Sequence, residues 1–104
     1  MAVDEGKKYD EGKPRLDLIP SEALNGLGKV LHYGATVKGY GARNWEKGME
    51  WGRIYGALQR HLTQWNGVED IDDESGLPHL YHAMAGISFL IALTERGVGE
   101  DTRK

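Results

Sequence analysis

Three of the four histidines and a short acidic segment are the residues best suited to chemistry in this sequence of 104 residues. His79 and His82 are three positions apart, so on a helix both imidazoles would leave the same face. His61 precedes the acidic segment, residues 69–74, which leads to the other two histidines. Imidazole together with carboxylate binds Mn, Fe, Co, Ni or Zn, whereas carboxylates alone prefer Mg or Ca. The predicted metal ligands are His61, Asp70, Asp72, His79 and His82.

The same cluster contains groups that are able to move a proton. A histidine titrates near neutral pH, and a carboxylate can accept a proton from water. The predicted catalytic residues are His61, Glu74 and His79. A structural interpretation also stays open, in which the histidines cap helices and pair with the acids at a corner of the fold. A calcium-binding loop is excluded, because Ser75 stands where such a loop needs glycine and Tyr81 where it needs glutamate.

Cationic and aromatic residues before the cluster are candidates for binding phosphate and a base. Ten of the thirteen Lys and Arg residues lie within residues 1–60, and none lies between His61 and Glu95. Arg and Lys pair with phosphate, and aromatic rings stack on bases. The phosphate candidates are Lys13, Arg15, Lys38, Arg43, Lys47, Arg53 and Arg60, and the stacking candidates are Tyr40 and Trp45. For Trp45, packing of a loop onto the core is an equally weighted alternative.

Composition limits the class of protein. Hydrophobic residues make up 39% and charged residues 28%, which is typical of a globular domain. No apolar run approaches the ~20 residues of a membrane span, and residues 1–8 lack the apolar core of a signal peptide. Cysteine is absent, which excludes disulfides and thiolate metal sites, and the net charge of −3 does not favour nucleic-acid binding. We therefore expect a cytoplasmic protein with no membrane partner and no stable nucleic-acid complex.

Helical periodicity predicts an all-α fold in which three main helices form a small bundle. Ser21 is the predicted N-cap of a first helix that runs to about residue 38. The second helix is expected over residues 51–65, where apolar residues recur at helical spacing. The third is expected over residues 78–96, with Pro78 in its first turn. The predicted apolar stripe of the second helix is Trp51, Tyr55, Leu58, Leu62 and Trp65.

The segments outside these helices set the predicted domain boundaries. Residues 1–13 are polar and are expected to be flexible, and the segment from Pro14 to Pro20 is expected to be extended. Residues 14–97 form the predicted single helical domain, and residues 98–104 are expected to be a frayed tail. A chain of this length buries only a modest core, so we expect a homo-oligomer.

Short motifs along most of the chain resemble one phage family. They are Lys8-Tyr9-Asp10-Glu11-Gly12-Lys13-Pro14-Arg15 and Leu18-Ile19-Pro20 near the start, Tyr33-Gly34-Ala35, Tyr40-Gly41 and Arg43-Asn44-Trp45-Glu46-Lys47-Gly48 in the middle, and Arg60-His61-Leu62, Glu74-Ser75-Gly76, His79-Leu80 and His82-Ala83 towards the end. Over residues 8–93 the sequence is similar to the N-terminal domain family of dATP/dGTP diphosphohydrolases of the MazZ type, which is MazG-like.

The resemblance implies an activity and a set of site residues. It implies an all-α oligomer that hydrolyses purine deoxynucleoside triphosphates, dGTP or dATP, to the monophosphate and pyrophosphate with a divalent cation, Mg or Mn. MazG-like enzymes hold Mg with Glu-x-x-Glu and Glu-x-x-Asp pairs, whereas this sequence has His79-x-x-His82 on its third predicted helix. The sequence ends soon after the resembling region, so we expect no downstream domain. The predicted nucleotide-binding residues, chosen for their charge, aromatic rings or place in the Arg43-Asn44-Trp45 segment, are Lys13, Arg15, Lys38, Tyr40, Arg43, Asn44, Trp45 and Arg60.

Three functions stay open on the sequence alone. The first is a metal-dependent nucleoside triphosphate pyrophosphohydrolase. The second is a phage binding protein that sequesters a nucleotide or a host defence signalling nucleotide without cleaving it, which the absence of the acidic pairs favours. The third is a structural or interaction protein in which the histidine and acid cluster only stabilises the fold.

Overall fold

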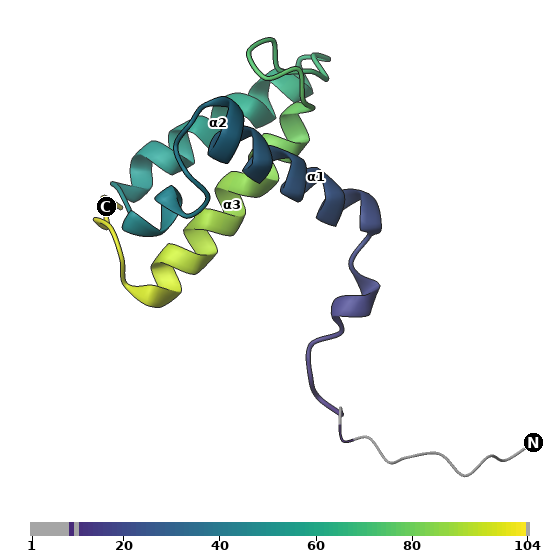
Figure 1. Ribbon diagram of the computed structural model, residues 1–104, viewed down its shortest axis with the longest axis vertical. Coiled ribbons are helices and arrows are strands. Elements are labelled where there is room, and N and C mark those ends of the chain that lie inside the picture. Colours follow the sequence, from purple (N-terminus) through teal and green to yellow (C-terminus); the bar gives the residue numbers. More distant parts are fainter. Residues whose placement is uncertain (1–8, 10, 104) are drawn as a thin grey trace, which may run out of the picture.

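Three α-helices make up most of the structure: α1 (Ser21–His32), α2 (Trp51–Asn66) and α3 (His79–Arg96). This computed structural model describes residue 9 and residues 11–103. The helices α2 and α3 run antiparallel and side by side, and α1 crosses over α3 (Figure 1). The described part of the chain contains no strand, and its only β-type pairing is in isolated β-bridges. The predicted all-α class is therefore confirmed.

The first helix begins one position away from its predicted cap. Ser21 is the first helical residue, and Pro20 occupies the cap position with its carbonyl accepting the N–H groups of Ala23 and Leu24. The helix continues through η2 (Tyr33–Val37), a single turn of π-helix, so the helical region ends near residue 38 as predicted. A π-turn of this kind is common at functional sites. Here it brings Tyr33 and Lys38 to the cavity described below.

Close packing of α1 on α3 depends on a glycine. A Cβ atom on Gly26 would lie 2.6 Å from Cδ1 of Tyr81, so only a residue without a side chain fits under this ring. Gly86 on α3 likewise lies against α2, where its Cβ would come 3.3 Å from Cβ of Leu58. These two glycines set how closely the three helices approach.

The buried core is narrower than the apolar pattern of the sequence predicts. Its hydrophobic members are Val30, Trp51, Ile54, Leu58, Ala83, Ala85 and Leu93. Within α2 the buried face is therefore Trp51, Ile54 and Leu58, whereas Tyr55 and Trp65 of the predicted stripe are 56% and 44% exposed. That part of the stripe is wrong, because the side of α2 that faces α3 is offset from the row of aromatic residues.

Backbone hydrogen bonds fold the loop between α2 and α3 back on itself. The N–H of Asp72 donates to the carbonyl of Leu77, and the N–H of His79 donates to the carbonyl of Asp70, both at 2.8 Å. The carboxylate of Asp72 also accepts the backbone N–H of Ser75 at 2.9 Å. The loop therefore holds Asp72 and the start of α3 in a fixed relation to each other.

The segments before and after the helices differ from expectation. Leu16–Leu18 forms a short 3-10 turn, η1, beside an Arg15–Asp17 ion pair, so the segment from Pro14 to Pro20 is not uniformly extended. It leads away from the helices (Figure 1). Residues 1–8 and 10, which fall in the predicted flexible segment, lie outside the described residues.

Residues 98–103 are not frayed but cap α2. Glu100 accepts the N–H of Trp51 at 2.9 Å through its carbonyl, and the hydroxyl oxygen of Thr102 accepts the N–H of Gly52 at 2.8 Å. The indole N–H of Trp51 donates to the carbonyl of Val98. These groups satisfy N–H donors that the start of a helix leaves unpaired, which explains why the tail is ordered. No helix in the described residues is long and apolar enough to cross a membrane.

Candidate functional site

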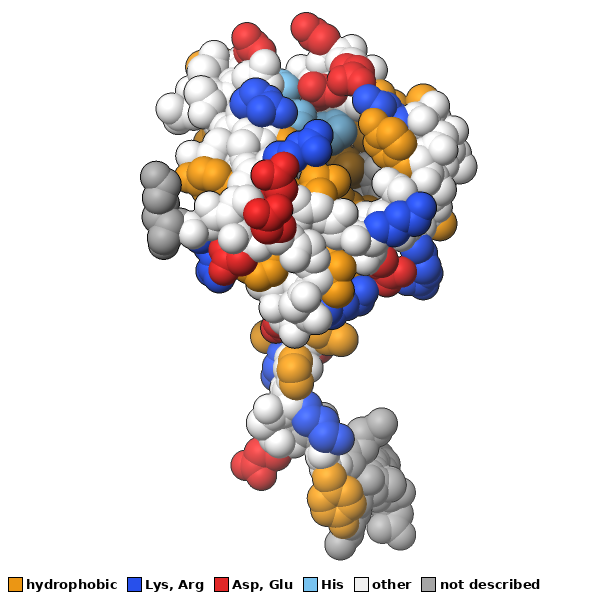
Figure 2. Space-filling view, turned by 90° about the vertical axis from the view of Figure 1, so that its left-hand side faces the viewer, with side chains coloured by type: hydrophobic (Ala, Val, Ile, Leu, Met, Phe, Trp, Pro, Cys, Tyr) orange, Lys and Arg blue, Asp and Glu red, His pale blue; other side chains and the backbone are white. Residues whose placement is uncertain are grey.

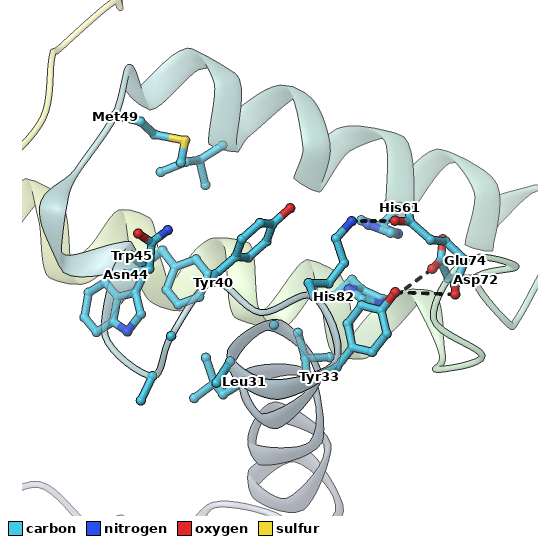
Figure 3. Close-up of a pocket in the computed structure, with 18 of the residues that line it drawn as sticks. Leu31, Tyr33, Tyr40, Asn44, Trp45, Met49, His61, Asp72, Glu74 and His82 are labelled. Carbon is cyan, nitrogen blue, oxygen red and sulfur yellow. Dashed lines mark hydrogen bonds and ion pairs between the residues drawn. The ribbon is translucent and has the colours of Figure 1, made fainter.

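An open cavity of about 510 Å³ lies between η2, the segment that follows it, α2, α3 and the acidic loop. Its lining has two chemically distinct ends, which Figure 3 shows. The first, here called the histidine end, contains His61, Asp72, Glu74 and His82. The second, here called the aromatic end, contains Tyr40, Asn44 and Trp45. In the space-filling view, histidine side chains lie in a hollow whose rim carries both acidic and basic side chains (Figure 2).

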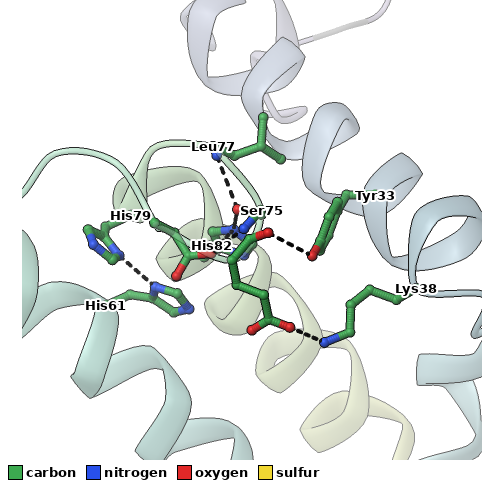
Figure 4. Close-up of polar contacts among 9 residues, drawn as sticks. Tyr33, Lys38, His61, Ser75, Leu77, His79 and His82 are labelled. Carbon is green, nitrogen blue, oxygen red and sulfur yellow. Dashed lines mark hydrogen bonds and ion pairs between the residues drawn. The ribbon is translucent and has the colours of Figure 1, made fainter.

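The histidine end is built around a contact between two helices. Nδ1 of His61 on α2 lies 2.9 Å from Nδ1 of His79 on α3 (Figure 4). The His79 side chain is 1% exposed, and its Nε2 is buried with no hydrogen-bond partner among the described residues. His61, Asp72 and His79 each offer a ligand atom within 4.8 Å of the others. The antiparallel packing of α2 and α3 thus joins two of the predicted ligands across eighteen positions of sequence.

His82 belongs to the same cluster but has a different neighbour. Its ring is nearly parallel to that of His61, with centroids 4.6 Å apart and an interplanar angle of 9°. Its Nε2 lies 2.6 Å from the hydroxyl oxygen of Ser75 and 3.7 Å from a carboxylate oxygen of Asp72. The Ser75 oxygen also accepts the N–H of Leu77 at 3.1 Å. Ser75 therefore holds the His82 ring beside the acidic loop.

Burial determines the charge state of this cluster. It lowers the pKa of both His61 and His82 below the usual value, and the neighbouring histidines lower both further. For Asp72, burial acts to raise the pKa, but hydrogen bonds from Ser75 and the nearby imidazoles lower it overall. At neutral pH, His61 and His82 therefore present neutral imidazoles beside the carboxylate of Asp72. This combination can bind a metal ion or accept a proton.

Lys38 and Glu74 connect η2 with the acidic loop across the mouth of the histidine end. Their side chains form an ion pair, and the hydroxyl of Tyr33 donates to the Glu74 carbonyl at 3.4 Å (Figure 4). The Lys38 ammonium also lies 5.7 Å from the centroid of the Tyr40 ring. Glu74 raises the pKa of Lys38, so this amine is a cation at neutral pH. A cation that already pairs with an anion at the cavity is well placed for phosphate.

The aromatic end contains one free and one packed ring. Tyr40 is 59% exposed, and its ring borders the cavity. Trp45 stacks on Phe89 of α3 with centroids 5.1 Å apart and an angle of 18°, and the guanidinium of Arg96 lies 5.1 Å from its ring. Trp45 therefore packs the η3 turn (Asn44–Lys47) onto α3, which is the alternative that the sequence left open. Tyr40 is the better candidate for stacking on a base.

The residue set fits a divalent cation on its own chemistry. Two imidazoles and a carboxylate are standard ligands for first-row metals, and His61, Asp72 and His79 offer ligand atoms that all lie within 4.8 Å of one another. Ligand atoms that share one ion at bond lengths of ~2.1 Å lie about 3.0–3.4 Å apart, which is close to the separation of the two Nδ1 atoms.

Residues 3–103 of this chain match the protein family described as "dATP/dGTP diphosphohydrolase, N-terminal". The chain belongs to this family. A dATP/dGTP diphosphohydrolase of Salmonella phage PMBT28 is 34% identical to it over 99 residues, which are 95% of this chain and 33% of that protein. The chain thus spans about a third of the length of the curated relative that it matches. No solved structure matches the chain.

In this member of the dATP/dGTP diphosphohydrolase N-terminal family, several predicted site residues lie outside the cavity. Arg15 pairs with Asp17 on the segment before α1, and Arg43 pairs with Glu46 in η3. Asp70 uses its backbone carbonyl to hold the start of α3. The remaining predicted residues that do not line the cavity are Lys13, Lys47, Arg53, Arg60 and His79. His79 nevertheless contacts the cavity through His61.

Three residues at the cavity of this family member were missed by the sequence reasoning. Ser75 contacts His82, Tyr33 contacts Glu74 and packs edge-on against His82, and Met49 lines the aromatic end. For Ser75 a signal was present, because a serine between an acidic run and a glycine is suited to a turn. Tyr33 and Met49 carry no such signal, since only tertiary packing brings them to the cavity.

Proposed function

We propose that this chain hydrolyses purine deoxynucleoside triphosphates, dGTP or dATP, to the monophosphate and pyrophosphate with a divalent cation. The observation that carries the proposal is the single cavity that combines three kinds of group. It joins metal-binding histidines and a carboxylate at one end with a lysine in the middle and an exposed tyrosine at the other end. Membership of the dATP/dGTP diphosphohydrolase N-terminal family supports the choice of substrate.

The two ends of the cavity give the nucleotide a direction. The base would stack on Tyr40, where the side-chain amide of Asn44 can hydrogen-bond its edge. The phosphates would extend past Lys38 towards the histidine end. In this orientation the negative phosphates meet the positive ammonium of Lys38. The carboxylates of Asp72 and Glu74 lie beyond Lys38, at the histidine end.

The reaction breaks the bond between the α-phosphorus and the oxygen that leads to the β-phosphate. A water oxygen attacks the α-phosphorus, and pyrophosphate leaves. A cation held by His61, Asp72 and His79 would neutralise charge on the phosphates. Glu74, whose carboxylate loses its cationic partner when Lys38 turns to phosphate, accepts the proton of the attacking water. His61 also borders the histidine end of the cavity, where the phosphates would lie, and His79 would act through its contact with His61.

The test is the incubation of purified protein with dGTP and with dATP in the presence of Mg²⁺ or Mn²⁺. Chromatography of the nucleotides and an assay for pyrophosphate measure the products. We expect equal amounts of monophosphate and pyrophosphate, a strong loss in His61→Gln, and no loss in the control His32→Gln on the exposed side of α1. Recovery of intact nucleotide with every combination would contradict hydrolysis, and tight binding of that nucleotide would indicate sequestration.

We also propose that the chain acts as a homo-oligomer in the cytoplasm of the host cell. An apolar groove of about 580 Å³ runs along α2 and α3 on the side away from α1, and Tyr55, Ile87 and Ile91 in it are 56%, 45% and 54% exposed. Contiguous exposed apolar surface of this kind is typical of association sites. Light scattering measures the oligomeric state, and a monomer at all concentrations would contradict this proposal.

A further inference from the structure

The contact between His61 and His79 has a geometry that suits a shared cation as well as a hydrogen bond. Their Nδ1 atoms lie 2.9 Å apart, so either one ring donates its N–H to the other or both nitrogens direct their lone pairs at one ion. His79 is 1% exposed, so water has little access to this contact. The carboxylate of Asp72 offers an oxygen within 4.8 Å of ligand atoms of both histidines. A negative group beside two nitrogen donors points to a cation.

The three ligands are held in position by parts of the fold that do not depend on an ion. The N–H of His79 donates to the carbonyl of Asp70 at 2.8 Å, which fixes the first turn of α3. The carboxylate of Asp72 accepts the N–H of Ser75 at 2.9 Å, which fixes the loop. His61 stands on the regular part of α2. Such a pre-arranged set binds its ion at a lower entropic cost than a flexible one.

We propose that His61, Asp72 and His79 form a resident site for a first-row transition-metal ion, which binds before any nucleotide is present. This site deepens the proposed function, on which its role in the reaction rests, by naming the class of the cation. Two imidazoles and one carboxylate favour Mn, Fe, Co, Ni or Zn, whereas Mg prefers oxygen ligands and arrives with the substrate phosphates. Three protein ligands leave positions open for water or phosphate oxygens, as catalytic metal sites do.

The neighbouring candidates for this ion have other contacts. Nε2 of His82 lies 2.6 Å from the hydroxyl oxygen of Ser75, and that hydroxyl also accepts the N–H of Leu77. Asp70 contributes its backbone carbonyl to the start of α3. The proposed ligand set is therefore smaller than the five residues that the sequence predicts, and His82 orients the site rather than binding the ion.

The experiment measures metal binding to the protein without nucleotide. Protein that carries no histidine tag is freed of metal with EDTA, which is then removed, and is titrated with Co²⁺, Zn²⁺ and Mg²⁺ by calorimetry. The visible absorption of bound Co²⁺ is recorded in parallel. We expect one Co²⁺ or Zn²⁺ per chain and an affinity at least 100-fold higher than for Mg²⁺. Absence of Co²⁺ and Zn²⁺ binding, or binding no tighter than that of Mg²⁺, would overturn the site.

Matched variants locate the ion. Asp72→Asn keeps an oxygen that accepts the Ser75 N–H but loses the charge, and His61→Gln removes a half-buried imidazole without opening the core. We expect each to lower the Co²⁺ affinity at least tenfold and to change the absorption spectrum. The controls Asp73→Asn and His32→Gln change exposed residues and should bind as the wild type does. Unchanged affinity in both Asp72→Asn and His61→Gln would overturn the assignment.

Failure of this site and failure of the proposed function give different results. If the protein hydrolyses dGTP with Mg²⁺ but does not bind Co²⁺, and Asp72→Asn leaves that hydrolysis intact, the resident site is overturned and the proposed function stands. Tight Co²⁺ binding at the three ligands in a protein that hydrolyses no nucleotide supports the site and contradicts the function.

Discussion

Lys38 and Glu74 form an ion pair that joins the end of η2 to the acidic loop, although the two residues are 36 positions apart in the sequence. Both residues line the cavity. The lysine that we propose as a phosphate ligand therefore already has an anionic partner in the protein. A phosphate group has to replace the Glu74 carboxylate at Lys38, so the two anions compete for one ammonium.

This competition predicts that Glu74→Gln binds inorganic pyrophosphate more tightly than the wild type when EDTA has removed metal ions. Because exposed ion pairs contribute little free energy, the expected gain in affinity is only about 1.4- to fivefold, measured by calorimetry. Lys38→Met should weaken the binding of pyrophosphate. When Glu74→Gln is added to Lys38→Met, most of the gain in affinity should be lost. Asp73→Asn, in the same loop, controls for the general loss of negative charge. A gain of the same size in Asp73→Asn, or in the Lys38→Met background, would contradict the competition.

The two aromatic side chains at the far end of the cavity should respond differently to substitution. Tyr40 is 59% exposed, and stacking of a base on such a ring contributes about 1–3 kcal/mol. Tyr40→Ala should therefore weaken nucleotide binding about 5- to 150-fold with little change in stability. Trp45→Ala should instead lower the free energy of unfolding by about 1–3 kcal/mol, because Trp45 packs on Phe89. Calorimetry with a non-hydrolysable dGTP analogue and urea unfolding separate the two effects, and equal losses of affinity would contradict this division.

Two glycines of α1 form a matched pair for testing the helix packing. A Cβ on Gly26 would lie 2.6 Å from the Tyr81 ring, whereas a Cβ on Gly28 would meet nothing within 4 Å. Gly26→Ala should lower the free energy of unfolding by about 1–3 kcal/mol through overpacking. Gly28→Ala should raise it by about 0.4–1 kcal/mol, because alanine is the better helix former. Urea unfolding measures both, and effects of the same sign would contradict the close approach of α1 and α3.

Stability should fall on mild acidification. The pKa values of His61 and His82 in the folded protein lie below their usual value, first because of burial, so in the window just below pH 6.5 the unfolded chain binds more protons. The folded state therefore loses stability as the pH falls through that window. In EDTA, the thermal midpoint should be lower at pH 5.5 than at pH 7.5, and the difference should shrink in His61→Gln and His82→Gln. A midpoint that rises on acidification would be incompatible with buried neutral imidazoles.

Local sequence patterns predict the helices better than they predict the buried face or the site. The third helix was predicted correctly except at its start, where Pro78 is the N-cap and His79 the first helical residue, and antiparallel packing then brings His61 close to His79. The buried face of α2 was shifted, because Tyr55 and Trp65 are apolar enough to enter the pattern and yet remain 56% and 44% exposed. Periodicity gives the width of an apolar stripe but does not say which edge of it a neighbouring helix covers.

The site was only partly predictable for a related reason. His61, Asp72 and His79 are close in sequence to the loop that joins α2 and α3, so the antiparallel packing of two consecutive helices is enough to bring them together. Arg15 and Arg43 depend on how distant segments return to the cavity, and here each pairs with a nearby acid instead. The order of the C-terminal tail likewise depends on the unpaired N–H groups of α2, which no pattern within residues 98–104 reveals.

The most direct test of the proposed hydrolysis is ³¹P NMR of dGTP incubated with the protein and Mn²⁺ or Mg²⁺ in water enriched in ¹⁸O, recorded after the metal has been removed by chelation. Attack of water at the α-phosphorus predicts dGMP that carries one ¹⁸O atom on its phosphate, together with an equal amount of unlabelled pyrophosphate. The formation of dGDP and inorganic phosphate, the appearance of ¹⁸O in pyrophosphate, or a spectrum of unchanged dGTP would contradict it.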